Sequence, residues 1–308
     1  MFWAVLGLVF VGLTWTIVGV VLGKAPQKGI PSEIMISFSA AVPAIVGALV
    51  LNSGIVETVD WTSKAAIVGS LYYTLAAFFN FFMMHLMSHA MQKGPNGIIW
   101  SITQSGMVLT FLYGVIFEGD IVTVLRIVGL ITILGALLLL GLARDNQGKE
   151  KSRTWIWMAL GCFLLCGTNQ ICAMIPTYIQ EVRDGFNSVA RSTVLSTATM
   201  VFALIWNIAS KRKAFFADMK QHIHNKYLWI FVGVQQGFCL LAAYFIQYRC
   251  IDYLSAHNHG SVAYPTLVAS CLVGFALYST FILREKTSFA QKLGMLLCVA
   301  GMILICLK

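Results

Sequence analysis

The sequence is divided into long apolar blocks, each of roughly 20 residues, which is the length that crosses about 30 Å of hydrocarbon as a helix. Only helices and closed barrels satisfy their backbone hydrogen bonds in lipid, and a barrel would show short alternating segments instead. We therefore expect an all-α integral membrane protein with ten transmembrane helices. The expected spans cover residues 2–22, 32–52, 64–87, 96–117, 122–143, 154–179, 188–210, 227–249, 259–283 and 288–307.

Composition excludes a water-soluble domain, because 58% of the 308 residues are hydrophobic and only 11% are charged, against about 25% in an ordinary soluble domain. No basic residue precedes the first block, and no cleavage site with a polar domain follows it, so we expect it to remain as the first span. The eight cysteines lie mostly inside apolar blocks, where a thiol behaves as a small hydrophobic group. No disulfide framework is expected.

Basic residues are distributed unevenly between the connections. The odd-numbered connections hold 15 of the 21 Lys and Arg residues, and the even-numbered connections and the carboxyl terminus hold the other 6. The positive-inside rule then places the odd-numbered connections, with the basic stretches 144–153 and 211–226, in the cytoplasm and both termini outside. This topology explains the net charge of +9, so no nucleic-acid partner is expected. The expected location is the inner (plasma) membrane of the cell, as a multi-pass protein.

Two stretches of the chain share one layout. Residues 96–141 consist of an apolar block, an acidic break at Glu118 and a second block spaced by glycines, and residues 259–307 repeat this order around Glu285. We interpret the chain as two five-helix repeats. Because five is an odd number, the second repeat enters the membrane inverted relative to the first. The repeats cover residues 1–143 and 154–308, and residues 144–153 form a basic cytoplasmic linker between them.

The segment FILREKTSFAQKLGMLLCVAGMILI, over residues 281–305, resembles the end of the repeat in the drug/metabolite transporter superfamily, of the EamA-like ten-span type. The resemblance implies a central cavity between the halves that opens alternately to each side of the membrane. It also implies that mainly spans one, three, four, six, eight and nine line this cavity and that spans five and ten are peripheral. Eukaryotic relatives commonly keep both termini in the cytosol, which disagrees with the orientation expected from the basic residues.

Polar side chains within spans are expensive in lipid, so we expect them to face protein or a water-filled path. In span three, Tyr73, Asn80 and Met84 follow a helical spacing and share one face. Such residues also form hydrogen-bonded contacts between helices, and this alternative stays open for each of them. The candidate substrate-binding residues are Thr14, Trp15, Tyr73, Asn80, Met84, Trp100, Gln104, Asn169, Gln170, Gln236, Tyr244, Gln247 and Tyr264.

Ionisable residues are missing from the middle of every expected span, and Glu33, Glu118, Asp252 and Glu285 all fall at span ends. A pump for cations would need a buried carboxylate, and an anion carrier would need a buried Lys or Arg. Amide and aromatic side chains instead suit neutral or zwitterionic solutes. We therefore expect a secondary transporter that moves an amino acid, nucleoside or related metabolite by alternating access. The alternative is a sugar uptake carrier of the same superfamily.

His85 and His89 are four residues apart, a spacing that can bind a metal on one helix face or relay protons. His257 and His259 lie in the equivalent turn of the other repeat. We expect interfacial histidines without a special role, so no metal and no cofactor is predicted, and proton coupling stays open.

An integral-membrane enzyme is less favoured, since the sequence lacks HExxH, GxSxG and Gly-rich phosphate motifs. The expected partners are a small-molecule substrate and the lipid bilayer, in a monomer or homodimer.

Overall fold

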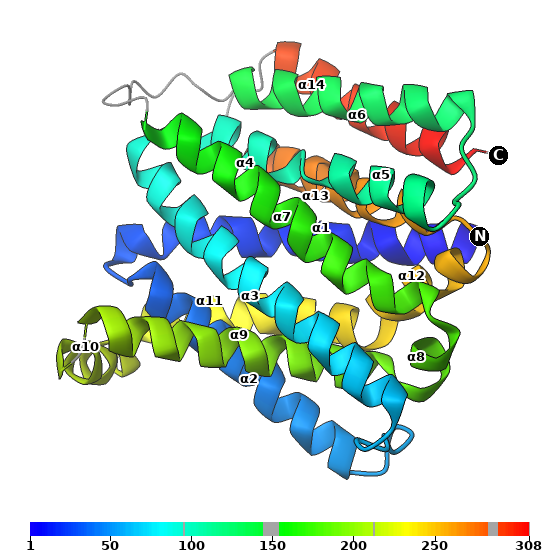
Figure 1. Cartoon of the computed structure of the whole chain (residues 1–308). Helices are drawn as coiled ribbons and strands as arrows, with labels where there is room; N and C mark the ends of the chain where they lie inside the picture. Colours follow the sequence, from blue (N-terminus) through cyan, green and yellow to red (C-terminus); the bar gives the residue numbers. More distant parts are fainter. Residues whose placement is uncertain (95, 144–153, 212, 283–288, 308) are drawn as a thin grey trace.

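In the computed structural model the chain is a bundle of helices, and the structure describes residues 1–94, 96–143, 154–211, 213–282 and 289–307. No strand occurs among these residues, and the long helices run side by side (Figure 1). The all-helical part of the expected fold is therefore confirmed. The helices are α1 (Phe2–Lys24), α2 (Ser32–Asn52), α3 (Lys64–Lys93), α4 (Asn96–Gln104), α5 (Met107–Phe117), α6 (Val124–Ala143), α7 (Thr154–Tyr178), α8 (Gln180–Gly185), α9 (Ser188–Lys211), α10 (Lys213–Ile223), α11 (Lys226–Leu241), α12 (Tyr248–Ala256), α13 (Ala263–Leu277) and α14 (Phe289–Cys306).

Among the described residues, seven helices are long and apolar enough to cross a membrane. They are Phe2–Lys24, Ser32–Asn52, Lys64–Lys93, Ile99–Phe117, Thr154–Tyr178, Ser188–Ser210 and Lys226–Ala256. Three shorter apolar helices, Val124–Leu139, Gly260–Gly274 and Lys292–Cys306, fall within the expected spans five, nine and ten. Helix length and composition are thus compatible with a membrane protein.

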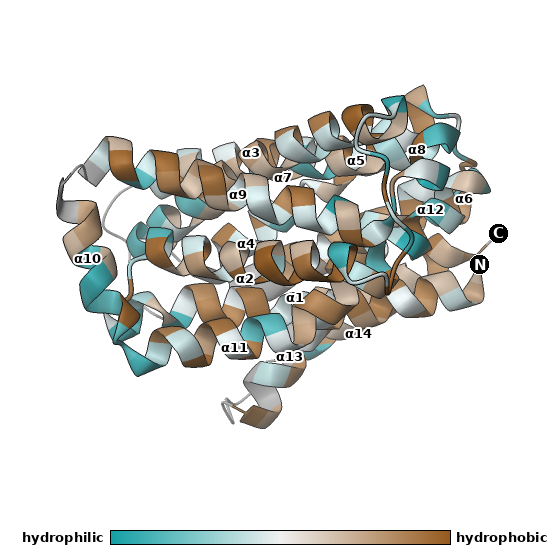
Figure 2. Cartoon of the chain, turned by 90° about the horizontal axis from the view of Figure 1, so that it is seen from below, coloured by the Kyte–Doolittle hydropathy of each residue, from teal (hydrophilic) through white to brown (hydrophobic). Residues whose placement is uncertain are grey.

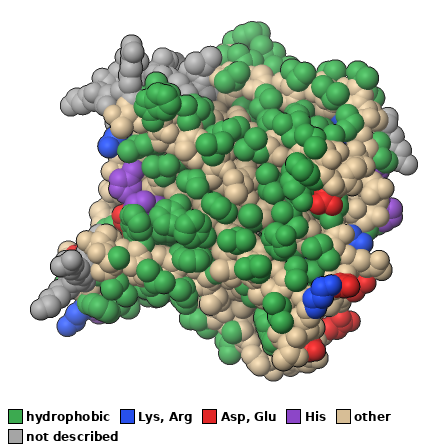
Figure 3. Space-filling view, viewed as in Figure 1, with side chains coloured by type: hydrophobic (Ala, Val, Ile, Leu, Met, Phe, Trp, Pro, Cys, Tyr) green, Lys and Arg blue, Asp and Glu red, His purple; other side chains and the backbone are tan. Residues whose placement is uncertain are grey.

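The outer surface of the bundle is apolar. Large hydrophobic side chains such as Phe10, Leu49, Ile131 and Phe238 are exposed on it. Figure 3 shows hydrophobic side chains over the middle of one face, with the charged side chains toward its edges. The hydropathy of the ribbon agrees, since many hydrophilic segments lie near helix ends (Figure 2). Soluble monomers rarely expose apolar patches larger than a few hundred Å², so this surface fits a lipid environment.

The two ends of the bundle differ, because both chain termini lie at one of them and several lysines at the other (Figure 1). We call the end with both termini the terminal end, and the opposite end the basic end because Lys24, Lys28, Lys93 and Lys226 lie there at or near helix ends. The terminal end also carries the connections 53–63, 118–123, 179–187 and 257–262.

Helices from the two halves of the sequence interlock. α1 packs on α13 and on the path from α11 to α12, α3 packs on α7 and α9, and α2 packs on α9 and α11. α4 and α5 pack on α7, whereas α6 and α14 pack against each other. Figure 1 shows α6 and α14 together at one side of the bundle. Many of the helix contacts therefore join the two halves, although α4 also packs on α6 within the first half and α13 on α14 within the second.

Two helices continue past their expected ends. α3 extends to Lys93 instead of residue 87, so that His89 lies within the helix. The eighth expected span continues through a π-helical turn, Ala242–Gln247, into α12, so that Asp252 lies inside a helix and not beyond the end of a span. Both extensions carry polar residues, which hydropathy alone assigns to connections.

The fourth expected span is broken into α4 and α5 at Ser105 and Gly106. A Cβ atom on Gly106 would lie 2.8 Å from the backbone nitrogen of Gly167 in α7, which is closer than side chains tolerate. Glycine therefore lets the two backbones approach each other, and the break in the helix lies at this contact.

Candidate functional site

A cavity of about 280 Å³ lies between helices of both halves. Its walls come from α1, α2, α3, α4, α7, α9, the path from α11 to α12, and the first turn of α13. Among the residues that the structure describes, α6 and α14 contribute none to the lining. This agrees with the peripheral position expected for spans five and ten.

Eleven of the thirteen candidate binding residues line this cavity. The structure thus brings together side chains that the sequence places in six different spans. Their contact with a solute stays a prediction. The eleven residues are Trp15, Asn80, Met84, Trp100, Gln104, Asn169, Gln170, Gln236, Tyr244, Gln247 and Tyr264.

Thr14 and Tyr73, the other two candidates, are not among the lining residues. The Thr14 hydroxyl donates to the carbonyl oxygen of Val11 at 2.7 Å, so its polar group is satisfied within α1. Tyr73 is fully buried and packs edge-on behind Tyr248, with ring centroids 5.2 Å apart. Tyr248 itself lines the cavity, so Tyr73 packs behind a residue of the cavity wall.

Two helices that the sequence analysis left out also line the cavity. α2 contributes Ser39 and Pro43, and α9 contributes Ser192, Ser196 and Thr199. The three α9 residues are spaced by four and three positions, which places them on one helix face. That stripe is present in the sequence, but small hydroxyl side chains are also common at contacts between membrane helices. Their spacing was therefore the only signal that could have identified them.

Several amide groups in the lining have no hydrogen-bond partner among the described residues. The side-chain oxygen of Gln104 is buried without a hydrogen bond, and Asn80, Asn169 and Gln247 make none with the described residues. Gln170 differs, because its side-chain oxygen accepts a hydrogen bond from Thr110 at 3.0 Å. Buried polar groups normally have partners. The four unpartnered amides therefore offer donors and acceptors to whatever occupies the cavity.

Pro43 leaves a backbone carbonyl oxygen free to accept a hydrogen bond from the side chain of Gln236. Proline has no N–H, so the carbonyl oxygen of Ser39, four residues earlier in α2, lacks its helical donor. The side-chain amide of Gln236 donates to this oxygen at 2.7 Å. The Ser39 hydroxyl in turn donates to the side-chain oxygen of Gln235 at 3.2 Å. These two bonds fasten α2 to α11 beside the cavity.

The π-helical turn Ala242–Gln247 forms part of the cavity wall. The carbonyl oxygen of Ala243 accepts a hydrogen bond from the Ser192 hydroxyl at 3.2 Å, and the Tyr244 hydroxyl donates to the carbonyl oxygen of Pro43. Single π turns are frequent at functional sites, because the extra residue changes which side chains share a face. Here the turn places both Tyr244 and Gln247 on the cavity.

The described lining contains no Asp, Glu, Lys, Arg or His side chain. A buried ion pair lies further toward the terminal end. Arg191 in the first turn of α9 is fully buried and donates to Asp252 at 2.6 Å, and its Nε donates to the carbonyl oxygen of Phe186 at 2.6 Å. The sequence analysis placed Asp252 at a span end, but its pairing with Arg191 joins two helices and could not be predicted from either helix alone.

Asp120 joins the two halves at the terminal end. Its carboxylate accepts a hydrogen bond from the Tyr178 hydroxyl at 2.7 Å and another from the backbone N–H of Ser261. Asp120 is only 4% exposed, so water competes little for these bonds. We call Asp120, Tyr178 and Ser261 the terminal latch.

Two further contacts between the halves flank the terminal latch. The backbone N–H of Ile121 donates to the carbonyl oxygen of Asn258 at 3.0 Å. The guanidinium of Arg126, a fully buried residue, lies 3.0 Å from Nδ1 of His259. The terminal end therefore carries directional polar bonds that cross between the halves.

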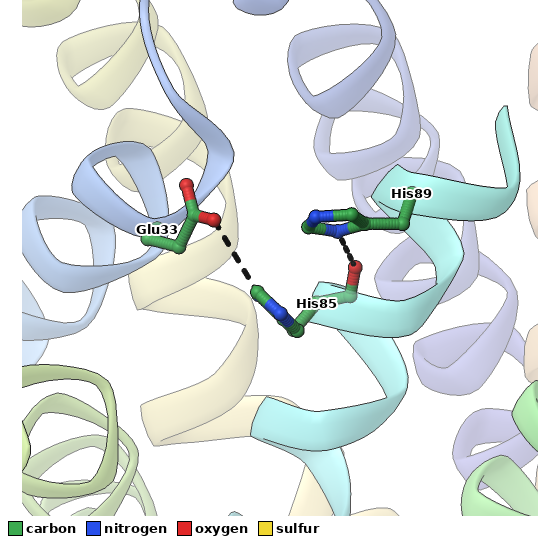
Figure 4. Close-up of side chains that lie close together, drawn as sticks. All are labelled: Glu33, His85 and His89. Carbon is green, nitrogen blue, oxygen red and sulfur yellow. Dashed lines mark hydrogen bonds and ion pairs between the residues drawn. The ribbon is translucent and has the colours of Figure 1, made fainter. Parts of the chain in front are cut away.

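The two histidine pairs lie at opposite ends of the bundle. His257 and His259 follow α12 at the terminal end, so they cannot supply a third ligand beside His85 and His89. Glu33 in the first turn of α2 is the neighbour of the α3 pair instead. Its Oε1 lies 3.7 Å from Nδ1 of His85 (Figure 4).

Comparison with known proteins informs the fold. No family model matches the sequence, and no curated protein matches it. By structure, 28 chains of solved proteins match. One of them, described only as "Crystal structure of protein", has a TM-score of 0.64 and 13% sequence identity, over 98% of this chain and 96% of its own length. At this identity the likeness concerns the fold alone.

Proposed function

We propose that the chain is a secondary transporter that moves a small neutral or zwitterionic organic solute by alternating access. One observation carries this function: a cavity between the halves is lined by unpartnered amides and aromatic rings and by no Asp, Glu, Lys, Arg or His side chain among the described residues. A site without a fixed charge has nothing to offset the desolvation of an ion, so it favours solutes without a net charge.

The size and chemistry of the cavity narrow the solute class. A volume of about 280 Å³ is at the low end for ligand sites, which commonly measure about 300–1,000 Å³. Amide groups bind hydroxyls, carbonyls and ring nitrogens, and the rings of Trp15 and Trp100 offer flat apolar surfaces. A nucleoside, a neutral amino acid or a related metabolite fits this description. A sugar is the second candidate, because hydroxyl groups pair with amides and sugar faces stack on indole rings.

The packing pattern supports ten spans arranged as two inverted repeats, residues 1–143 and 154–308. If a two-fold axis relates the halves, every helix contact recurs when the halves are exchanged. The contact of α1 with α13 then corresponds to that of α7 with α4 and α5, and the contact of α3 with α9 corresponds to that of α11 with α2. The contacts α2 with α9 and α6 with α14 correspond to themselves. All of these contacts occur.

Alternating access requires that one end of the bundle is closed while the cavity is reached from the other. The lining residues include Leu22, Met35 and Met87, which lie close to the basic end, whereas toward the terminal end the lining stops at Tyr248 and Tyr264. We infer that the cavity is reached from the basic end. With the basic connections in the cytoplasm, this conformation faces inward.

We also propose that the chain is a member of the drug/metabolite transporter superfamily, because of the arrangement of its helices. Three features support this proposal: the two repeats of five helices, the peripheral pair α6 and α14, and the segment 281–305. Residues 283–288 of that segment lie outside the described residues, so its support comes from the sequence.

A thermal-shift screen of the purified protein against nucleosides, neutral amino acids and sugars tests this function, because a ligand that prefers the folded state raises its apparent stability. We expect one class to raise the unfolding midpoint and the same compound to cross the membrane of proteoliposomes that contain the protein. Analogues with a net charge should bind more weakly. Stabilisation by charged compounds alone, or conversion of a ligand into a product, would contradict the proposed transporter.

Substitutions in the lining connect this binding to the cavity. Gln104→Ala and Asn169→Ala each remove an unpartnered amide, and we expect each to weaken ligand binding roughly fivefold, as the loss of one net hydrogen bond of about 1 kcal/mol implies. Asn52→Ala is the matched control, because that amide is exposed and donates within its own helix to the carbonyl oxygen of Ala48. Wild-type affinity in both cavity variants would place the solute elsewhere.

A further inference from the structure

We propose that Glu33, His85 and His89 form a binding site for a divalent transition-metal ion of the Zn²⁺ type. We call these three residues the histidine–glutamate cluster. One ligand atom from each of them lies within 4.8 Å of the others. The cluster stands outside the cavity lining, so the proposed metal site does not depend on the proposed transport function.

The cluster joins two helices at the basic end. His85 and His89 occupy consecutive turns near the end of α3, and Glu33 comes from the first turn of α2 (Figure 4). A spacing of four residues places both imidazoles on one helix face. All three side chains are partly buried, so a bound ion would be shielded from bulk water without being cut off from it.

Hydrogen bonds already orient two of the three ligands. Nδ1 of His89 lies 3.0 Å from the carbonyl oxygen of His85, an arrangement that keeps the proton on Nδ1 and leaves the Nε2 lone pair for a metal. The hydroxyl of Ser32 donates to Oε2 of Glu33 at 3.4 Å, which leaves Oε1 facing His85. Such orienting partners are typical of metal-binding histidines and carboxylates.

His85 supplies the observation that points most directly to a ligand. Its Nδ1 is buried and makes no hydrogen bond with any described residue, although Oε1 of Glu33 lies only 3.7 Å away. A buried polar atom without a partner is uncommon in a native protein. A metal ion between the imidazole and the carboxylate would satisfy both atoms.

The ligand set selects the kind of ion. Two imidazoles and one carboxylate suit Zn²⁺ and neighbouring transition metals, whereas Mg²⁺ and Ca²⁺ take oxygen ligands. Tetrahedral Zn²⁺ with bonds of about 2.0–2.1 Å holds its ligand atoms roughly 3.4 Å apart, so the side chains need only a small closure from their present separation. Three protein ligands leave the fourth position to water.

Metal binding to the purified, chelator-treated full-length protein, prepared with an affinity tag that contains no histidine, tests this site. We expect saturable Zn²⁺ binding by calorimetry and a rise in the unfolding midpoint. Co²⁺ should give the visible absorption of a nitrogen and oxygen site. His85→Gln, His89→Gln and Glu33→Gln should each weaken Zn²⁺ binding by at least about 100-fold, since losing even an orienting partner costs about 10–100-fold.

His257→Gln is the matched control, because His257 lies at the terminal end, where it pairs with the carbonyl oxygen of Tyr253. It should bind Zn²⁺ as the wild type does. Three outcomes would overturn the site: no saturable Zn²⁺ binding by the wild type, unchanged affinity in the three cluster variants, or a Co²⁺ spectrum with the intense charge-transfer bands of cysteine thiolate. The last outcome would assign the metal to some of the eight free cysteines.

Discussion

At the terminal end of the bundle, buried polar groups form bonds that cross directly between the halves, whereas at the basic end the cavity is bordered by methionines. The terminal end holds the terminal latch and the Arg191–Asp252 pair. The basic end holds the lining residues Met35 and Met87. Methionine is flexible and forms no strong directional bonds. The terminal end therefore carries directional bonds between buried groups, whereas the cavity lining near the basic end includes flexible apolar side chains.

The largest expected effect comes from breaking the buried pair at the terminal end. Asp252→Ala leaves the fully buried guanidinium of Arg191 without its carboxylate. We expect it to lower the free energy of unfolding by about 3–5 kcal/mol, as for other buried pairs that lose one partner. The midpoint of denaturant unfolding in detergent measures this change.

Glu181→Ala is the control for that prediction. Glu181 forms an ion pair with Lys64 at 3.3 Å at the same end, but both side chains are largely exposed. Exposed pairs contribute about 0–1 kcal/mol, so the variant should unfold close to the wild type. Equal losses from Asp252→Ala and Glu181→Ala would remove the claim that buried bonds hold this end.

A smaller effect is expected from the terminal latch. Tyr178→Phe removes the donor to Asp120, a hydrogen bond to a charged group that contributes about 1.5–3 kcal/mol. Because this bond joins the halves, its loss should also populate conformations that open toward the terminal end. Solute flux and solvent access to the cavity from that end should therefore change together.

Tyr113→Phe sharpens this test. The Tyr113 hydroxyl donates to Glu118 at 2.7 Å, so it is also a tyrosine–carboxylate bond near the terminal end, but both residues belong to the first half. We expect this variant to lose some stability and to keep wild-type access to the cavity. If the two tyrosine variants change access equally, the terminal latch does not control the opening of this end.

The smallest effect concerns the contact of α2 with α11 in the half of the bundle nearer the basic end. Gln236→Ala should cost about 1 kcal/mol, because it leaves the Ser39 carbonyl oxygen without its donor. In a Pro43→Ala background the restored backbone N–H can bond that oxygen, so Gln236→Ala should then cost little. A double-mutant cycle by denaturant unfolding should give a coupling of about 1 kcal/mol. Additive losses would show that Pro43 does not create the need for Gln236.

The sequence predicts the helices and much of the cavity because both leave local signals. Asn80, Gln104 and Asn169 are polar residues within apolar blocks, and their cost in lipid is enough to place them inside the bundle. Ser192 and Ser196 gave a weaker signal, because a hydroxyl can be satisfied within its own helix as Thr14 is. Local patterns therefore distinguish residues that face the interior of the bundle from residues that face lipid. They do not distinguish residues that line the cavity from residues at a contact between helices.

The polar network at the terminal end was beyond sequence analysis for a different reason. Asp120 meets Tyr178 and Ser261 only after helices from both halves pack, and Arg191 meets Asp252 in the same way. The hydropathy pattern assigns such charged or polar residues to the ends of spans. The close approach of Gly106 to Gly167 of α7 is similar, since it also joins segments that are far apart in the sequence. Pairing between distant segments is set by tertiary packing, which no local pattern encodes.

Access to Cys239 tests most directly whether the cavity is reached from the basic end. Cys239 lines the cavity as a free thiol, and the difference in labelling between the wild type and Cys239→Ala isolates its signal from the other cysteines. In sealed vesicles of known orientation, a membrane-impermeant thiol reagent applied at the basic end should modify Cys239, and a bound solute should slow this reaction. Modification only from the terminal end, or no protection by any solute that binds, would contradict an uncharged solute cavity closed by the terminal latch.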